Sequence, residues 1–188
     1  MGLPAIQAAL PAYAKDIRLN LGTVLGASPL TPEQCWGAAL ACAVAARNPV
    51  VLRELAAEAQ AHLKPDTVAA AKGAAAVMAM NNVYYRGKHL LEDEAYASLP
   101  ARLRMQLIAT ATRDGAVAKA DFELWCLAVS AVTGCGACLR AHERELRAAG
   151  ATREQVHEAL RIAAVVHAAA VALDAETALA ADPAPEAG

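Results

Sequence analysis

The almost unbroken supply of helix-forming residues is the feature that most limits what this chain can fold into. Ala, Leu, Arg, Glu and Gln dominate, Gly and Pro stand at plausible joints, and no stretch alternates apolar and polar residues as a strand does. The 188 residues are 57% hydrophobic, which is enough for one well-buried core. We therefore expect one all-α domain over residues 1–182 and a flexible tail over 183–188.

Capping patterns predict where several helices begin. Thr31-Pro32-Glu33-Gln34 offers a cap residue, a proline at the first helical position and a glutamine that completes a capping box, so a helix is expected from there to about Arg47. Thr152 and Gln155 form a second capping box that opens a long helix to about Ala181. Residues 84–100 are expected to form loops with a short helix. The remaining helices are expected at about 50–63, 65–81, 101–111, from before Glu123 to about 132, and 135–150.

A faint internal repeat accompanies these helices. Trp36 and Trp125 each lie in a helix that is followed by a short break, a second helix and a third helix, at an offset of about 88 residues. This pattern suggests a duplicated three-helix unit, about 31–85 and 120–175. Two helical hairpins in an alanine-rich chain can also look alike without duplication, and the sequence leaves that alternative open.

Charge and hydropathy exclude some classes of function. The net charge is −2 and aromatic residues make up 4% of the chain, which argues against nucleic acid as a partner. The N-terminus has neither the pattern of a signal peptide nor that of myristoylation. The longest uncharged run, Leu124 to Leu139, is shorter than the about 18 apolar residues of a membrane span. We expect a soluble, cytoplasmic protein with no membrane contact.

The chemistry of the chain is concentrated in Cys135-Gly136-Ala137-Cys138 and in His142, one helical turn further on. Two thiols three residues apart at a helix start can close a disulfide with little backbone change, and the helix N-terminus favours a thiolate. His142 lies on the same helical face as Cys138, where an imidazole can take or stabilise the thiol proton. The motif predicts a redox-active dithiol with its own acid–base partner.

The other cysteines and a metal site are the competing interpretations. Cys35, Cys42 and Cys126 stand in apolar stretches and are expected to be small buried hydrophobes. A structural zinc site needs four ligands, and no second CxxC or evident fourth ligand accompanies the motif, so we expect no bound metal and no bound cofactor.

Glu123 lies in the helix before the motif. If the two helices form an antiparallel hairpin around Gly134, Glu123 stands opposite about residue 146, roughly 6 Å along the axis from His142. One water would bridge that gap, and the carboxylate would then orient the imidazole as the third member of a triad does. A solvated glutamate at a helix start is the alternative, since Asp121 is also nearby.

Sequence reasoning leaves open which thiol attacks a substrate. In thioredoxin-like folds the first cysteine is the exposed one, which favours Cys135, whereas the base next to Cys138 favours Cys138. Both can act in one cycle, in which one cysteine forms a sulfenic acid and the other condenses with it to a disulfide.

These segments resemble the AhpD alkylhydroperoxidases of the carboxymuconolactone decarboxylase-like superfamily. The resemblance covers nearly the whole chain and is carried by Leu10 to Ile17, Met80 to Gly87, Phe122 to Trp125 and Gly134 to Glu143. It implies an all-helical fold from a duplicated unit, assembled as a homotrimer. It further implies antioxidant, thiol-dependent reduction of organic hydroperoxides, with electrons passed from a lipoylated acyltransferase and its dihydrolipoamide dehydrogenase to the peroxiredoxin AhpC.

The resemblance also implies roles for the site residues. Cys138 would form the sulfenic acid, Cys135 would be proton donor and disulfide partner, and Glu123 and His142 would form a proton relay through a water. The disulfide between the two cysteines would be reduced by dihydrolipoamide or a lipoylated protein. One departure is Ala137, because studied members have a histidine immediately before the second cysteine.

Three other functions are weighed against a peroxidase. Because Ala137 stands where studied members have a histidine, an electron-transfer adaptor with negligible peroxidase activity of its own stays an alternative. A decarboxylase would have no use for a dithiol, and a helical scaffold would make the CxxC incidental.

Several residues outside the motif are interpreted more plainly. His157 and His167 are expected in the core or an interface, and His62 and His89 on the surface. Met78-Ala79-Met80 is expected in the core. The polar, aromatic patch from Asn81 to Arg86 would line an entrance or an interface, or simply end a helix.

Overall fold

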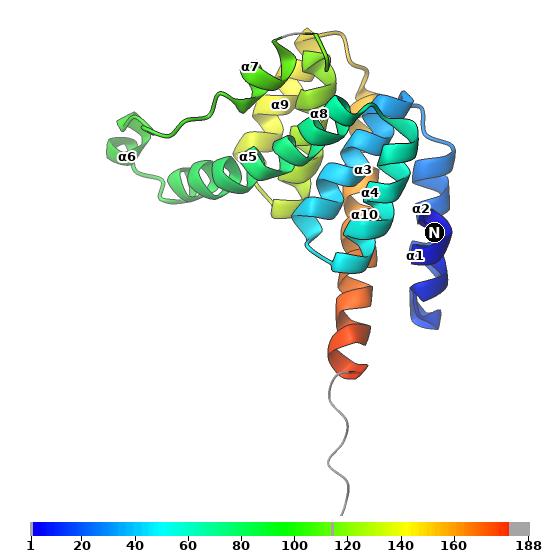
Figure 1. Ribbon diagram of the computed structural model, residues 1–188. Coiled ribbons are helices and arrows are strands. Elements are labelled where there is room, and N and C mark those ends of the chain that lie inside the picture. The colour runs from blue at the N-terminus through cyan, green and yellow to red at the C-terminus, as the bar shows by residue number, and fades with distance from the viewer. Residues whose placement is uncertain (1, 114, 181–188) are drawn as a thin grey trace, which may run out of the picture.

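A computed structural model describes residues 2–113 and 115–180, and over these ranges the chain is helical and contains no strand. The expectation of an all-α class is therefore confirmed (Figure 1). The expected tail over 183–188 lies outside the described residues. In chain order the helices are α1 (Leu3–Ala9), the 3-10 turn η1 (Ala12–Ala14), α2 (Lys15–Gly26), α3 (Pro32–Ala46), α4 (Pro49–His62), α5 (Pro65–Leu90), α6 (Glu94–Ser98), α7 (Leu107–Thr112), α8 (Lys119–Thr133), α9 (Gly136–Ala148) and α10 (Arg153–Ala180).

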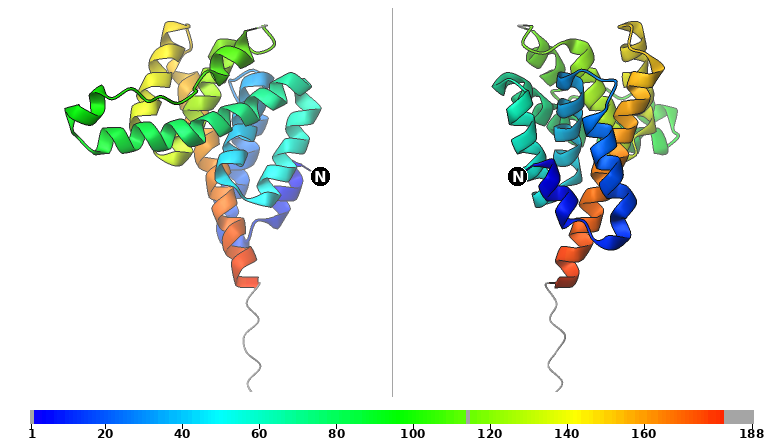
Figure 2. Two further views of the ribbon diagram at one scale, coloured as in Figure 1. Left: turned by 60° about the vertical axis from the view of Figure 1, so that its left-hand side comes forward. Right: turned by 90° about the vertical axis from the view of Figure 1, so that its right-hand side faces the viewer.

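Helices α3 and α8 lie at the centre of the molecule. They pack against each other, and α5 and α10 each pack against both of them. The helices α3, α4 and α5 have 15, 14 and 26 residues, and α8, α9 and α10 follow in the same order with 15, 13 and 28. Figure 2 shows the crossing of these helices from two further sides. The core lies around α3 and α8 and also takes buried side chains from α2, α4, α5 and α10; many of them are alanines, and Trp125 and Phe122 are its largest members.

A glycine lets the two central helices approach closely. A Cβ on Gly37 of α3 would lie 2.3 Å from the indole ring of Trp125 on α8, which is well inside van der Waals contact. The indole is fully buried. The position therefore needs a residue without a side chain, and the contact sets how far apart α3 and α8 can lie.

The capping predictions are confirmed. Thr31 and Gln34 form a reciprocal capping box at the start of α3, with N–O distances of 3.2 Å in both directions. Thr152 and Gln155 do the same before α10, at 2.9 and 3.1 Å. These bonds satisfy amide groups that a helix start leaves without a partner, which is why the pattern could be found from the sequence.

Two expected boundaries are wrong. The helix expected to end at about residue 81 continues to Leu90, because Asn81 and Asn82 turn towards the body of the protein instead of ending the helix. The helix expected over 101–111 covers only Leu107–Thr112. Residues 101–106 hold good helix formers but bury no apolar face against the body, and Arg102 has a left-handed φ of 50°. Propensity without packing rarely sustains so short a helix.

The end of α5 and the residues that follow form an arm, defined here as residues 84–107, that runs out from the helical body (Figure 1). Large apolar side chains on this arm are exposed in the single chain; they are Leu90, Leu91, Tyr96, Leu99 and Leu103. Such a concentration of exposed apolar surface is typical of a region that contacts another molecule.

By length and composition alone, α10 could also cross a membrane. Core helices of proteins in water pass the same test, and one face of α10 packs here against α2, α3 and α8. The buried positions Ala159, Ile162, Ala163 and Val166 recur at the spacing of a helix face that covers a protein core.

Candidate active site

The turn between α8 and α9 presents the two cysteines. Gly134 ends α8 in the left-handed conformation, with φ of 71°, as expected from its sequence position. Its amide donates to Ala131 O at 3.2 Å, and the amide of Cys135 donates to Ser130 O at 3.0 Å. This pair of bonds is the Schellman motif, which reverses the chain tightly and fixes the residue after the glycine. The motif therefore holds Cys135 at the mouth of the hairpin.

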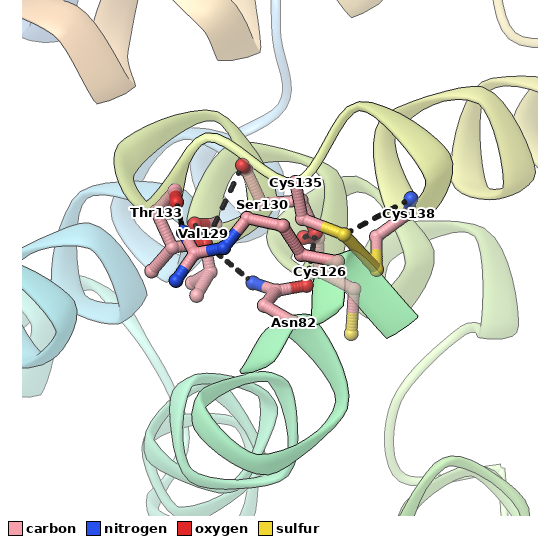
Figure 3. The surroundings of a disulfide bond; sticks show 8 residues. Asn82, Cys126, Val129, Ser130, Thr133, Cys135 and Cys138 are labelled. Atoms are coloured by element: carbon pink, nitrogen blue, oxygen red, sulfur yellow. Dashed lines mark hydrogen bonds between the residues drawn. A yellow bond between two sulfur atoms is a disulfide. The ribbon is translucent and has the colours of Figure 1, made fainter. Parts of the chain in front are cut away.

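Cys135 is the N-cap residue of α9, and the structure joins it to Cys138 by a disulfide (Figure 3). The two Cα atoms are 5.3 Å apart, and the amide of Cys138 lies 3.3 Å from the sulfur of Cys135. The first turn of α9 thus brings both sulfurs together without any rearrangement of the helix. Its N-terminal amides also favour negative charge on the sulfur atoms when the disulfide is reduced.

Polar side chains of α5 fasten this turn from the side (Figure 3). Asn82 donates to Thr133 Oγ1 at 2.7 Å and accepts from Ser130 Oγ at 3.1 Å, and Arg86 donates to the carbonyl of Thr133. Asn82 is almost fully buried. For the patch from Asn81 to Arg86, the sequence left open an entrance, an interface or a helix end. Two of its residues, Asn82 and Arg86, hold the end of α8 next to the cysteine turn.

Glu123 and His142 face each other across the α8–α9 hairpin. Glu123 Oε2 and His142 Nδ1 are 2.6 Å apart, and the residues are 5% and 9% exposed. The expected antiparallel hairpin is present, but no gap remains for a bridging water between these two side chains. The helices approach closely enough for Glu123 to reach His142 directly, and Lys119 pairs with Glu145 at 2.8 Å one turn away.

The direct bond sets the chemistry of the imidazole. An ionised carboxylate accepts a hydrogen bond from Nδ1–H, so that Nε2 is the ring nitrogen left to accept a proton from another group. Glu123 is therefore no solvated helix-start residue. The nearby Asp121 binds elsewhere, since its Oδ1 accepts from Gln34 Nε2 at 2.9 Å. Burial raises the pKa of Asp121, and that hydrogen bond opposes the rise.

A cavity of about 460 Å³ opens beside the disulfide, between α5 and α9. Its lining residues are Met78, Asn81, Tyr85, Lys88, His89, Ala137, Cys138, Ala141 and His142. Cys138 borders the cavity and is 5% exposed, whereas Cys135 has no exposed surface. The thioredoxin-like argument for an exposed first cysteine is therefore wrong for this fold, because the turn buries Cys135 beneath α8.

Sequence reasoning missed the part that α5 plays in this cavity. Tyr85, Lys88 and His89 follow Asn81 by four, seven and eight residues, which is about one and two helical turns, so the four residues share one face. That periodicity was visible in the sequence. It lies beyond residue 81, where the sequence analysis expected the helix to end. His89 is exposed, as expected, and lies at the rim of the cavity.

The cysteines outside the motif have the environment that was expected. Cys35, Cys42 and Cys126 are buried and free. Burial raises the pKa of Cys35 to about 11 and also raises the pKa values of Cys42 and Cys126. A thiol that stays protonated is a poor nucleophile, so these three contribute packing.

The remaining expectations have mixed outcomes. Of Met78-Ala79-Met80, all expected in the core, Met78 is buried and also borders the cavity, Met80 is half-buried, and Ala79 is exposed, so the expectation is wrong for Ala79. His157 and His167 are exposed on α10, so they do not lie in the core, and their alternative place in an interface stays a prediction. His62 stacks on Trp36 with ring centroids 4.7 Å apart. Within residues 2–113 and 115–180, no group of three or more His, Cys, Asp or Glu side chains is arranged to hold a metal ion.

The fold and site together define an all-helical protein with a disulfide at a helix N-terminus, backed by a buried carboxylate–imidazole pair. Residues 94–181 match the carboxymuconolactone decarboxylase family. The chain is 56% identical to the alkyl hydroperoxide reductase AhpD of Streptomyces coelicolor, over 97% of this chain and 100% of that protein. It is 54% identical to the protein of the same name from Rhodospirillum centenum, over 95% and 94% of the two chains. The chain belongs to the AhpD family of the carboxymuconolactone decarboxylase-like superfamily.

Proposed function

We propose that this protein is an antioxidant peroxidase that reduces organic hydroperoxides through a dithiol–disulfide cycle of Cys135 and Cys138. The observation that carries the proposal is the disulfide beside a cavity that His142 also lines. Nδ1 of His142 lies 2.6 Å from Glu123 Oε2, which leaves Nε2 free for proton transfer. Relatives about 50–56% identical along nearly their whole length bear the name alkyl hydroperoxide reductase AhpD, and that name supports the same reaction here.

In the first step the thiolate of Cys138 attacks the outer oxygen of the hydroperoxide. A sulfur–oxygen bond forms, the oxygen–oxygen bond breaks, and the departing alkoxide takes a proton to become an alcohol. Cys138 is then a sulfenic acid. Its position at the cavity, with Cys135 fully enclosed, supports Cys138 as the attacking sulfur.

In the second step Cys135 acts as proton donor and disulfide partner. Its sulfur attacks the sulfenic sulfur of Cys138, the hydroxyl group leaves as water, and the disulfide seen in the structure results. In the first step His142 takes the thiol proton of Cys138 on Nε2 and then donates it to the departing alkoxide. Glu123 keeps the imidazole in the tautomer and orientation that this transfer needs.

The disulfide needs an external dithiol to complete the cycle. We propose dihydrolipoamide, free or on a lipoylated acyltransferase served by dihydrolipoamide dehydrogenase, as the reductant, and the peroxiredoxin AhpC as a protein that receives the electrons. The cavity beside Cys138 supports this proposal because an extended dithiol can enter it. We place this activity in the cytoplasm.

We propose a homotrimer built from chains that each form one domain, over about 1–182, and that each contain a duplicated helical unit. The exposed apolar side chains of the arm support assembly, and the matched lengths of α3–α5 and α8–α10 support duplication. Sedimentation of the pure protein at three times the mass of one chain is the expected result, and a monomer at micromolar concentration would contradict the assembly.

An electron-transfer adaptor with negligible peroxidase activity is the second candidate. The observation in its favour is Ala137, which brings no side-chain base to the cavity wall between the two cysteines. The two candidates share the disulfide and its reduction, and they differ in whether the protein alone consumes peroxide.

The test is peroxide consumption by the pure protein with dihydrolipoamide and cumene hydroperoxide. Turnover that is lost in Cys135→Ser and in Cys138→Ser is the expected result. If the wild type shows no turnover while dihydrolipoamide still reduces its disulfide, and consumption begins only when the peroxiredoxin is added, the protein is an adaptor.

A further inference from the structure

The cavity beside Cys138 contains a buried polar group that the mechanism above leaves unused. Asn81 is 9% exposed, lies on α5 and borders the same cavity as Cys138 and His142. Its Oδ1 is buried and has no hydrogen-bond partner among the described residues. Leaving such an acceptor unpaired costs stability, and at the wall of a cavity a bound molecule can supply the missing donor.

Three polar neighbours of Asn81 on the cavity wall form bonds elsewhere. The Tyr85 hydroxyl contacts the sulfur of Met105 at 3.4 Å, and the Lys88 ammonium donates to the carbonyl of Leu99 at 2.8 Å. His142 Nδ1 is bound to Glu123. Neither these groups nor His89, which also borders the cavity, donates to Asn81 Oδ1, so a molecule that occupies the cavity can supply the donor.

The adjacent Asn82 provides the contrast. Its side chain is fully used, with Thr133 Oγ1 at 2.7 Å and Ser130 Oγ at 3.1 Å, and it holds the redox turn in place. Two successive asparagines on one helix thus have different surroundings: one is bonded within the protein, and the other faces the cavity with an unpaired acceptor.

We propose that Asn81 binds the hydroperoxide substrate by accepting a hydrogen bond from its O–H group. This inference rests on the proposed function, because the hydroperoxide is the substrate that the function brings to Cys138. Met78, Ala137 and Ala141 give the cavity apolar walls that suit the organic part of the substrate. The hydrogen bond then holds the outer oxygen, the atom that the thiolate attacks, at the polar end.

The test separates the two half-reactions in single-turnover experiments. Reduced protein is mixed with cumene hydroperoxide, and oxidised protein is mixed separately with dihydrolipoamide. In Asn81→Leu, the rate constant for oxidation is expected to fall about 3- to 10-fold, as for one lost hydrogen bond, while that for reduction stays unchanged. Asn81→Ala, which cannot overfill the cavity, is expected to behave in the same way.

Thermal unfolding supplies an independent readout. Asn81→Leu replaces an unpaired buried acceptor by an apolar group of similar size, so its Tm is expected to equal or exceed that of the wild type. Asn82→Leu is the matched control and is expected to lower the Tm, because it breaks two bonds within the protein.

Three results would overturn the proposal: an unchanged oxidation rate constant, an equal fall in both half-reactions, or a fall in reduction alone, which would assign Asn81 to the reductant. A wild-type protein that cumene hydroperoxide does not oxidise would overturn the proposed peroxidase function itself, and with it this role of Asn81.

Discussion

At the scale of single residues, the pair Glu123–His142 distinguishes this cysteine motif from a simple disulfide. Replacing Glu123 by Gln keeps a hydrogen-bond acceptor but removes the charge that stabilises a protonated imidazole. We expect the rate constant for oxidation of the reduced protein by cumene hydroperoxide to fall by about 100-fold in Glu123→Gln, with the fold intact by circular dichroism.

Asp121→Asn is the matched control for this prediction. Asp121 lies two residues away on α8, but its carboxylate binds Gln34, and an asparagine can keep that bond. We expect the same oxidation rate constant as in the wild type. An equal loss in both variants would mean that the negative charge of the helix start matters and that the contact with His142 does not.

A second prediction at this scale concerns the reactivity of the five thiols. Burial raises the pKa of Cys35 to about 11, so at pH 8 only about one molecule in a thousand has a Cys35 thiolate. That fraction grows as the pH rises, as for every thiol, but the raised pKa shifts the growth to a higher pH range than for an exposed cysteine. Alkylation of the reduced protein with iodoacetamide at pH 8 is expected to modify Cys138 first, and Cys35, Cys42 and Cys126 only after unfolding.

Peptide mapping by mass spectrometry reads out this experiment. The three buried cysteines serve as internal controls for one another, and guanidinium provides the unfolded reference. Rapid labelling of Cys42 or Cys126 in the folded protein would show that the core opens in a way that this packing does not allow.

Much of the residue scale could be predicted from the sequence. The CxxC, the histidine on the same helical face and the preceding glutamate were all found, because helix periodicity fixes which side chains are neighbours. The direct Glu123–His142 bond was not, since the tilt and separation of two helices depend on packing such as that of Trp125 on Gly37. Asn81 was left open, because burial within a cavity is a tertiary property.

At the scale of elements, the close crossing of α3 and α8 is the most sensitive contact. A methyl group at Gly37 would meet the indole of the fully buried Trp125 at 2.3 Å, so the packing around it would have to shift. Gly37→Ala is expected to lower the free energy of unfolding by about 1–3 kcal/mol, as overpacking does. Urea denaturation followed by circular dichroism measures this change.

Gly87→Ala is the control within α5. A Cβ there would meet nothing within 4 Å, so the substitution adds only helix propensity and is expected to stabilise the protein by about 0.5–1 kcal/mol. If Gly37→Ala proved as stable as Gly87→Ala, the close contact between the central helices would be contradicted.

The errors at this scale share one cause. Asparagines often end helices, and the expected boundary at residue 81 followed that tendency. Here Asn82 and Arg86 bond to the turn after α8, so contacts distant in sequence extend α5 by nine residues. Residues 101–106 show the opposite case, in which helix formers remain without helix because none of them is buried in the core.

At the scale of the whole molecule, the two sets of three helices have the same order but different chemistry. The position of Cys135 at the start of α9 corresponds to that of Asn48 at the start of α4. Asn48 caps its helix through Val50 N and Val51 N at 3.0 and 2.9 Å, and it also donates to Asp174 of α10 at 2.7 Å. One turn is thus a structural joint, whereas the other carries the dithiol.

The arm gives the molecule an asymmetric outline that the core does not need. It carries the end of α5, and therefore Lys88 and His89, out to the rim of the cavity (Figure 1). Its exposed leucines could be counted from the sequence, but their exposure depends on the absence of contacts with the helical body. The assembly that we propose would cover them and complete the surroundings of the site.

The central claim is that Cys138 is the sulfur that attacks the peroxide, and trapping of the sulfenic acid tests it most directly. Reduced Cys135→Ser and Cys138→Ser are each treated with one equivalent of cumene hydroperoxide and dimedone, and the adducts are located by mass spectrometry. We predict an adduct on Cys138 in Cys135→Ser and none on Cys135 in Cys138→Ser. An adduct on Cys135 without one on Cys138 would contradict the account.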